Sequence, residues 1–180
     1  MFRMPTLRMD GRCKALGFSA LGLATLCMAA GALGARINTS YSLPMGLYIG
    51  TNAEDAPFVE FCPAGRFAEE SGKRGYRTLG FACPDGAVPL LKPVVARGGD
   101  QVETSPLGIS VNGVLLPKTA PLPKDSALRL LDHWPFGAYI VAPGTIWVAS
   151  TYHAGSYDSR YMGPIPTSQI RRRLRALWTL

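Results

Sequence analysis

The 180-residue sequence predicts a mainly β, antiparallel domain that follows one N-terminal membrane-spanning helix. Three observations lead to this prediction. Residues 15–35 contain no charged side chain. Glycine (20) and proline (15) are abundant, whereas charged residues make up 17% of the chain, below the usual ~25%. Short apolar or alternating runs recur between turn residues along the rest of the chain, as in antiparallel β domains.

The uncharged segment at residues 15–35 is long enough to span a bilayer as a helix. Basic residues precede it, so the positive-inside rule places residues 1–14 in the cytoplasm and residues 36–180 across the membrane. A cleaved signal peptide is the alternative, because Ala30-Gly31-Ala32 resembles a cleavage site. The uncharged run is longer than the apolar region of a typical signal peptide, and this length favours an uncleaved anchor. Both interpretations export residues 36–180.

The net charge of +7 is concentrated at the two ends of the chain. Residues 1–14 and 171–180 account for all of it, and the stretch between them is neutral. A nucleic-acid partner needs a basic face spread over the fold, so we expect none. The sequence also lacks the common phosphate-binding, dinucleotide-binding and metalloprotease motifs, and we expect no cofactor and no metal.

The exported part contains two cysteines, Cys62 and Cys83, each followed by proline in a turn-like context. An oxidising compartment would pair them and add on the order of 3 kcal/mol in the chain-entropy model. Two buried free thiols are the alternative. Cys13 and Cys27 fall beside and inside the membrane segment, where the sequence assigns them no task.

The exported part reads as a succession of short strands with one short helix at residues 67–74, inside the cysteine loop. Asn112-Gly113 lies between β-forming residues and predicts a tight hairpin. Residues 117–137 begin with three prolines in seven residues and predict an irregular excursion. The basic C-terminus is either a last strand or an amphipathic segment against anionic lipid. The expected strands cover residues 46–49, 58–61, 88–96, 108–116, 138–142, 145–149 and 170–180.

Three short segments carry the candidate chemistry. In the first, Ser40 and Ser42 flank Tyr41, and Pro44 constrains Leu43 to an extended conformation. A stiff turn of this kind can present the Ser42 hydroxyl in a fixed direction, with Ser40 on the same side of an extended chain. Ser42 lies within about 25 Å of the membrane surface at ~3.5 Å per residue. A polar juxtamembrane linker is the alternative.

The second segment contains Lys92, the single charge in the apolar run of residues 88–96. Burial among apolar side chains pushes an amine toward its neutral form, which is what a lysine general base requires. The alternative is a gatekeeper lysine on an edge strand, with its amine in water. In the third segment, Asp158 and Arg160 are two residues apart after Ser156 and would share one face of an extended strand. A surface salt bridge is the alternative there.

Taken in order, these segments resemble the signal peptidase (leader peptidase, S26) superfamily of Ser/Lys proteases. They are most similar to its TraF-type branch, the conjugative-transfer peptidases that mature pilin subunits. The likeness rests on Asn38-Thr39 with Ser42-x-Pro44-x-Gly46-Leu47-Tyr48, on Lys92 with Val94-Val95 and Gly99-Asp100-x-Val102, and on the run from Ser156 to Gly163. The contexts of the two cysteines, Phe61-Cys62-Pro63 and Phe81-Ala82-Cys83-Pro84, also resemble this branch.

The resemblance implies a signal-peptidase-like antiparallel β domain and a role for each candidate residue. Ser42 would be the nucleophile and neutral Lys92 its general base. The Ser42 backbone N–H and the Ser40 hydroxyl would form the oxyanion hole. Ser156 would orient the Lys92 amine, while Asp158 and Arg160 would hold the site together.

Two departures from the ordinary signal peptidase pattern favour the specialised branch. Pro93 stands where an arginine commonly follows the base, and Ser150-Thr151 stands where Gly-Asp-Asn often occurs. The resemblance therefore implies an endopeptidase in the bacterial inner (cytoplasmic) membrane, with its catalytic domain in the periplasm. Its partners would be a pilin precursor, the lipid bilayer and the conjugative secretion apparatus. The precursor would be cleaved and either left linear or circularised.

Three other functions remain as alternatives. The first is a general type I signal peptidase. The second keeps a serine nucleophile but uses His153 or His133, with Asp158 or Asp132, as a conventional triad. The third is a non-catalytic assembly protein of a pilus or secretion apparatus, because a fold of this kind does not fix a function.

Overall fold

A computed structural model describes residues 34–180, and Arg36–Leu180 form one folded unit. The expected cytoplasmic N-terminus, residues 15–33 of the expected anchor, Cys13 and Cys27 all lie outside the described residues. Within residues 34–180, no helix has the length and apolar character needed to cross a membrane.

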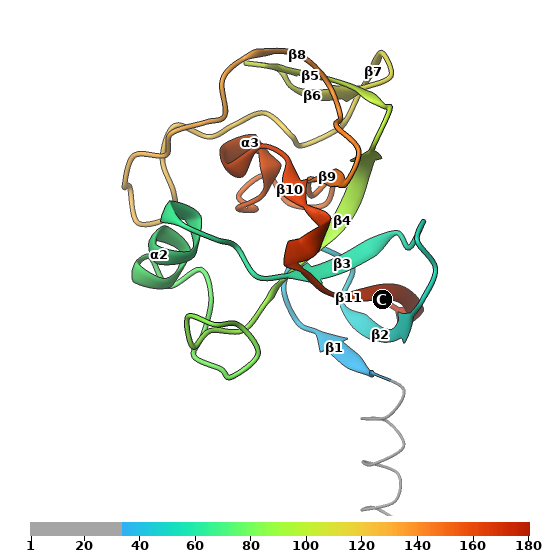
Figure 1. Ribbon diagram of the computed structural model, residues 1–180. Coiled ribbons are helices and arrows are strands. Elements are labelled where there is room, and N and C mark those ends of the chain that lie inside the picture. Colours follow the sequence, from blue (N-terminus) through green and yellow to red (C-terminus); the bar gives the residue numbers. More distant parts are fainter. Residues whose placement is uncertain (1–33) are drawn as a thin grey trace, which may run out of the picture. The chain divides into compact units, whose positions relative to one another are not determined.

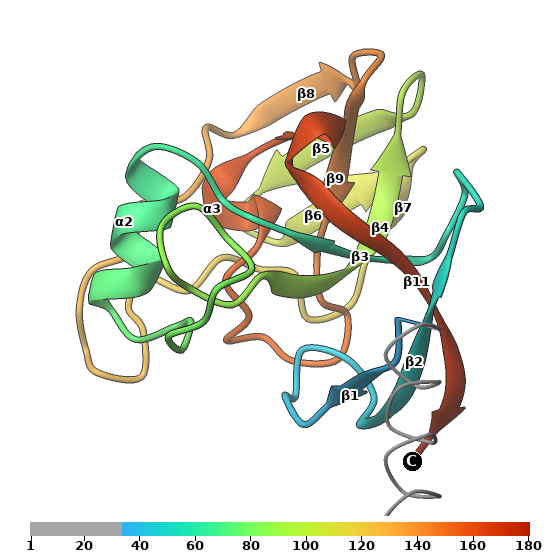
Figure 2. The same cartoon turned by 60° about the horizontal axis from the view of Figure 1, so that its bottom comes forward.

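Two antiparallel sheets make up the folded unit, as Figures 1 and 2 show. The larger has seven strands in the order β1-β2-β11-β3-β4-β9-β10, and the smaller has four in the order β7-β6-β5-β8. The strands of the larger sheet are β1 (Arg36–Asn38), β2 (Gly46–Thr51), β3 (Phe58–Phe61), β4 (Leu90–Arg97), β9 (Thr145–Val148), β10 (Ile165–Pro166) and β11 (Ile170–Thr179). Those of the smaller are β5 (Gln101–Ser105), β6 (Gly108–Val111), β7 (Val114–Leu115) and β8 (Gly137–Ile140). The mainly β, antiparallel prediction is confirmed.

All the strands expected from the sequence are present, with shifts of a few residues at their ends. The hairpin prediction is confirmed, because Asn112 and Gly113 both adopt positive φ (49° and 82°) between β6 and β7. Strands β1, β5 and β10 were not expected. In β5, charged and polar residues alternate with buried Val102 and Thr104, so the apolar signal is sparse. The expected excursion contains no strand between β7 and β8.

The C-terminal residues form the long strand β11, which pairs with β2 on one side and β3 on the other. Its central residue Leu174 is fully buried. The alternative of an amphipathic segment for this stretch is therefore wrong. Two backbone hydrogen-bond ladders hold it in the sheet, and these outweigh the local pattern of four arginines.

Strand β4 lies between β3 and β9 in the interior of the larger sheet. A gatekeeper lysine requires an edge strand, so this alternative is wrong for Lys92. Pro93, which has no N–H to donate, is accommodated because the register with β9 shifts between Val94 and Ala96. The Pro93 carbonyl still accepts from the Ala149 N–H.

The main hydrophobic core lies between the larger sheet and the residues around the short helix α3 (Ser159–Met162). Phe61, Leu90 and Val148 come from three neighbouring strands of that sheet. They meet Tyr157 and Tyr161 from the α3 region. This packing fixes the Ser156–Arg160 segment against β4 and β9.

Helix α2 (Arg66–Lys73) lies inside the loop that a Cys62–Cys83 disulfide closes, close to the predicted range. The two Cα atoms are 5.6 Å apart, and both cysteines are buried. Arg77 is also buried there and joins the helix to the end of the loop through Ser71 and Asp85. The disulfide and this ion pair together fasten α2 to the end of β3.

We expect the double variant Cys62→Ser/Cys83→Ser to lose about 3 kcal/mol of unfolding free energy, because the unfolded chain is no longer cross-linked. Urea titration of the oxidised wild type and the variant measures the difference. Reduction should lower the wild type to the level of the variant and leave the variant unchanged. Equal midpoints for the oxidised wild type and the variant would contradict this expectation.

Candidate functional site

The turn that carries Ser42 is organised by the side chain of Asn38, at the end of β1. The buried Asn38 amide donates to the carbonyls of Ser40, Leu43 and Pro44, at 3.0 to 3.3 Å. Leu43 is inserted into the core, so the chain on both sides of Ser42 is fixed. The structure therefore contains the expected fixed turn around Ser42.

The extended chain expected around Ser40 and Ser42 is wrong. Residues 40–43 form a turn and a bend instead of an extended chain, so alternation does not set their directions. The Ser40 hydroxyl donates to Asn38 Oδ1 at 2.8 Å, which stabilises the turn. The physical reason is that a serine near an asparagine finds its hydrogen-bond partner locally.

Ser150 was not among the residues expected from the sequence, but it contacts the backbone of Ser42. The side chain of this fully buried residue donates to the Ser42 carbonyl at 2.7 Å. The hydroxyl oxygen of Ser150 also accepts from the backbone N–H groups of Tyr152 and His153. Ser150 therefore ties the turn of Ser42 to the loop after β9. A serine beside a strand end carries no sequence signal for such a long-range contact.

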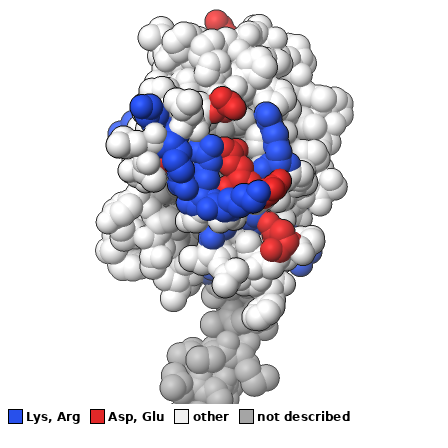
Figure 3. All heavy atoms as spheres, turned by 90° about the vertical axis from the view of Figure 1, so that its left-hand side faces the viewer, with Lys and Arg blue, Asp and Glu red and all other residues white. Residues whose placement is uncertain are grey.

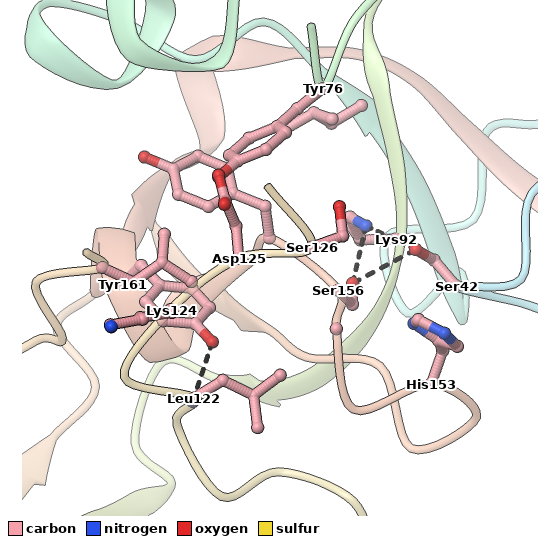
Figure 4. A pocket seen from close by; sticks show the side chains of 14 residues that line it. Ser42, Tyr76, Lys92, Leu122, Lys124, Asp125, Ser126, His153, Ser156 and Tyr161 are labelled. Atoms are coloured by element: carbon pink, nitrogen blue, oxygen red, sulfur yellow. Dashed lines mark hydrogen bonds between the residues drawn. The ribbon is translucent and has the colours of Figure 1, made fainter. Parts of the chain in front are cut away.

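The amine of Lys92 is the centre of the site. Lys92 is 5% exposed and lies on β4 opposite Val59 of β3. Its Nζ donates to Ser42 Oγ at 2.8 Å and to Ser156 Oγ at 2.7 Å, as Figure 4 shows. Ser42 also donates to Ser156, at 3.2 Å. The structure thus brings together three of the predicted residues, from three distant segments.

Burial lowers the pKa of Lys92 to about 8. The carboxylate of Asp158 acts in the opposite direction, and the guanidinium of Arg160 opposes that carboxylate. Because the pKa falls near physiological pH, an appreciable share of the amine is neutral there. A neutral amine in hydrogen-bond contact with a hydroxyl is able to accept its proton.

Asp158 and Arg160 form a buried ion pair behind the site, so the surface salt bridge alternative is wrong. Asp158 is fully buried, and Arg160 is 3% exposed. Both carboxylate oxygens accept from the guanidinium at 2.8 Å. The expected extended strand is also wrong, because Asp158 caps the first turn of α3 and Arg160 lies within that helix.

The ion pair connects several parts of the site. Asp158 Oδ2 accepts from the Ser150 N–H at 2.9 Å. Arg160 donates to the carbonyls of Ser156, Ala154 and Lys118. The pair therefore holds the Ser156 segment, the Ser150 loop and the start of the excursion together, without a hydrogen bond to Ser42 or Lys92 among the described residues.

The two histidines are placed differently. His153 lines the same cavity as Ser42 and stacks on Tyr41, with ring centroids 6.1 Å apart. His133 is exposed and stacks on Phe136 instead. The hydrogen-bond partner of Ser42 is Lys92 and not an imidazole.

A cavity of about 570 Å³ opens beside the Ser42–Lys92 pair. Its walls come from β4, the Ser156–Tyr161 segment, Tyr76 after α2, and residues 122–131 of the excursion. Clusters of histidine, cysteine, aspartate and glutamate able to hold a metal ion do not occur within residues 34–180.

The family description "Signal peptidase, peptidase S26" matches residues 38–179 of this chain. The chain belongs to this signal peptidase family. The match begins at Asn38 and so includes every residue of the site described above. The mainly β antiparallel fold and the Ser42–Lys92–Ser156 cluster are therefore features of a signal peptidase family member.

Relatives of this signal peptidase family member carry names from plasmid transfer. A "Plasmid transfer protein TraF" from Escherichia coli is 39% identical over 171 residues, 92% of this chain and 95% of its own. A "Probable conjugal transfer protein TraF" from Sinorhizobium fredii is 38% identical over 162 residues, 83% and 84% of the two chains. A solved signal peptidase I from Enterococcus faecalis V583 matches 66% of this chain and 92% of its own, with 18% identity and a TM-score of 0.35.

The pKa of Lys92 predicts how the reactivity of Ser42 depends on pH. The neutral fraction of the amine grows as the pH rises through about 8, so labelling of Ser42 by a fluorophosphonate should accelerate over that range. Below the pKa the rate should fall about tenfold per pH unit. Intact-mass spectrometry of the labelled protein gives the rates.

The matched control for that titration is Lys92→Ala, which should label about 100-fold more slowly. The pH dependence of its remaining labelling rate should be that of the reagent alone, without a midpoint near pH 8. A wild-type rate that stays flat or declines across this range would argue against Lys92 as the base.

The buried ion pair predicts a large effect on stability. Asp158→Ala leaves the Arg160 guanidinium buried without its carboxylate, and should cost about 3–5 kcal/mol of unfolding free energy. The exposed pair of Lys73 and Glu69 is the matched comparison, and Glu69→Ala should change stability by less than about 1 kcal/mol. Denaturant titration measures both. Similar small losses would show that the burial of Asp158 contributes little.

Proposed function

We propose that this chain is a membrane-anchored serine endopeptidase that processes a pilin precursor in bacterial conjugation, with Ser42 as nucleophile and Lys92 as general base. One observation carries the proposal. A buried amine with a pKa of about 8 lies 2.8 Å from a serine hydroxyl at the wall of a cavity. A nucleophile within hydrogen-bond reach of its base is the geometry that acyl transfer requires.

In the proposed reaction, neutral Lys92 accepts the Ser42 proton while Ser42 Oγ attacks the carbonyl carbon of the scissile peptide bond. The resulting ammonium then gives that proton to the leaving nitrogen, and the C–N bond breaks to leave an ester on Ser42. A water molecule or an amine, activated by the same Lys92, attacks the ester and releases Ser42. Attack by water gives a linear product, whereas attack by the substrate's own N-terminus gives a circular one.

The remaining candidate residues support these steps. Ser156 accepts from Lys92 at 2.7 Å and so aims the amine at Ser42. Asp158 and Arg160 keep Ser156 in place from behind, through the Ser156 carbonyl. The Ser42 backbone N–H, joined by the Ser40 hydroxyl once it turns from Asn38, would donate to the oxyanion.

Two relatives favour conjugation over general secretion as the setting. Both bear the name TraF, one a plasmid transfer protein and one a probable conjugal transfer protein, and each matches more than four fifths of this chain. The substrate is accordingly proposed to be a conjugative pilin precursor, with the secretion apparatus as a further partner. General type I signal peptidase activity remains the alternative within the family.

The location follows from the sequence at residues 1–36. We propose a single-pass anchor at residues 15–35 in the bacterial inner membrane, with the N-terminus in the cytoplasm and the catalytic domain in the periplasm. The Cys62–Cys83 disulfide is consistent with an oxidising compartment. Ser42 follows the anchor closely in sequence, which suits substrates held in the same bilayer.

Co-expression with a candidate pilin precursor tests the proposal. Wild type should yield a shortened product, whereas Ser42→Ala and Lys92→Ala should leave the precursor intact, because each removes one partner of the proton transfer. The intact mass of the product reports the outcome, and a mass one water lower than that of the linear peptide identifies circularisation.

His153→Ala and His133→Ala serve as controls and should retain the product, since Lys92 holds the hydrogen bond to Ser42. Loss of the product in His153→Ala, with activity kept in Lys92→Ala, would favour the conventional triad. A wild type that neither processes the precursor nor labels with a fluorophosphonate would favour a non-catalytic assembly role.

A further inference from the structure

The cavity beside Ser42 presents the rings of its tyrosines, because the fold already uses their hydroxyls. Tyr76 donates to Asp125 at 2.6 Å, and Tyr157 donates to Glu70 at 2.6 Å. Burial and the Glu70 carboxylate raise the pKa of Tyr157 far above its usual value, so its phenol stays protonated. The hydroxyls of these two side chains therefore provide no free donor to a bound substrate.

The hydroxyl of the third tyrosine is also engaged, but as an acceptor. The Tyr161 hydroxyl accepts from the Leu122 backbone N–H at 3.0 Å. The side chains of Leu90, Leu122 and Leu131 complete the lining between the rings. Away from Ser42, the wall is therefore largely aromatic and aliphatic, and the polar side chains that the excursion adds to it are Lys124, Asp125 and Ser126.

One wall of the cavity is the segment 122–131, and the carboxylate of Asp125 fixes its shape. Asp125 accepts from the backbone N–H groups of Ala127 and Arg129 and from Arg129 Nε. Its contact with Tyr76, together with a 2.9 Å hydrogen bond from Arg74 to the Leu130 carbonyl, ties the segment to the end of α2. The size of the cavity is thus set by a fixed loop.

The outer side of this region is charged, in contrast to the inner wall. Figure 3 shows basic and acidic side chains next to each other on the face that carries α2. Among the ion pairs there are Glu69 with Lys73, and Arg129 with Asp125. These charged side chains are thus paired with each other, and Asp125 contributes both to an ion pair and to the lining of the cavity.

The volume of the cavity exceeds what a small side chain fills. At about 570 Å³ it falls within the range of pockets that enclose whole small-molecule ligands. A methyl group placed beside Ser42 would leave most of the aromatic wall without a partner. A leucine, methionine, phenylalanine or tyrosine side chain would cover it.

We propose that this cavity is a specificity pocket for a large apolar side chain of the substrate within three residues of the scissile bond, and that residues 122–131 set the size preference. The inference rests on the proposed peptidase function. It concerns which polypeptides Ser42 attacks and leaves the chemistry of the attack unchanged.

The test uses the full-length chain in detergent micelles and an equimolar library of synthetic peptides, with cut positions read by mass spectrometry. Cuts made by wild type and absent from Ser42→Ala define the preference. We expect leucine, methionine, phenylalanine or tyrosine to be enriched about tenfold over glycine and alanine at one position near the cut. Wild-type cuts with no such enrichment, or with glycine and alanine favoured at every position, would overturn the proposal.

The matched variants are Leu131→Trp, which fills the cavity, and Leu130→Trp, next to it in sequence but exposed and outside the lining. Leu131→Trp should shift the preference to glycine and alanine, and Leu130→Trp should keep the wild-type preference. Leu122→Trp is a second filling variant in case Leu131→Trp does not fold. If both filling variants keep the wild-type preference, the pocket assignment is wrong.

Fluorophosphonate labelling of Ser42 separates failure of this inference from failure of the proposed function. Wild type and Leu130→Trp should both label, since neither the Ser42–Lys92 pair nor the cavity lining is changed in them. Labelling and cleavage without a size preference overturn the pocket alone. A wild type that neither labels nor cleaves overturns the peptidase function, and the pocket proposal with it.

Discussion

The site depends on the amine of Lys92 being buried where two serine hydroxyls meet it. Strand β4 is interior to the larger sheet, so the Lys92 side chain leaves it on a face covered by the Ser42 turn and the Ser156 segment. Burial of the amine disfavours its charged form, and the pKa falls to about 8. The same two hydrogen bonds also hold the amine against the Ser42 hydroxyl.

The ion pair behind the site balances the charge on this amine. The carboxylate of Asp158 alone would favour the ammonium form of Lys92, and Arg160 offsets that effect by pairing with both of its oxygens. Arg160 also donates hydrogen bonds to the carbonyls of Ser156 and of Lys118, at the start of the excursion. One buried pair thus contributes to stability, to the position of Ser156 and to the pKa of Lys92.

The irregular excursion between β7 and β8 supplies what the two sheets lack, a wall facing the reactive serine. Leu122 and Leu131 of the excursion line the cavity, and its Asp125 forms an ion pair with Arg74 at the end of α2. The Cys62–Cys83 disulfide holds α2 against the end of β3. The cavity is therefore shaped by elements outside the sheets, and these are the parts in which related enzymes could differ while the Ser42–Lys92 pair stays the same.

Much of the fold and the site follows from local features of the sequence. Strands rich in β-branched residues, the Asn112-Gly113 hairpin, the short helix near residue 67 and the serine-proline turn each reflect short-range preferences of the chain. A lone lysine in an apolar run and a serine before a proline drew attention to Lys92 and Ser42, and the family resemblance predicted that they pair. The family resemblance then supplied the role of Ser156.

Other features were decided by the tertiary structure, because they depend on which distant segments pack together. Sequence does not tell whether Lys92 is on an edge or an interior strand, since that depends on where β9 pairs. Asp158 and Arg160 form a buried pair only because α3 packs against the larger sheet. Ser40 turns to Asn38, and Ser150 reaches the Ser42 carbonyl, through hydrogen bonds that no pattern of residue types encodes.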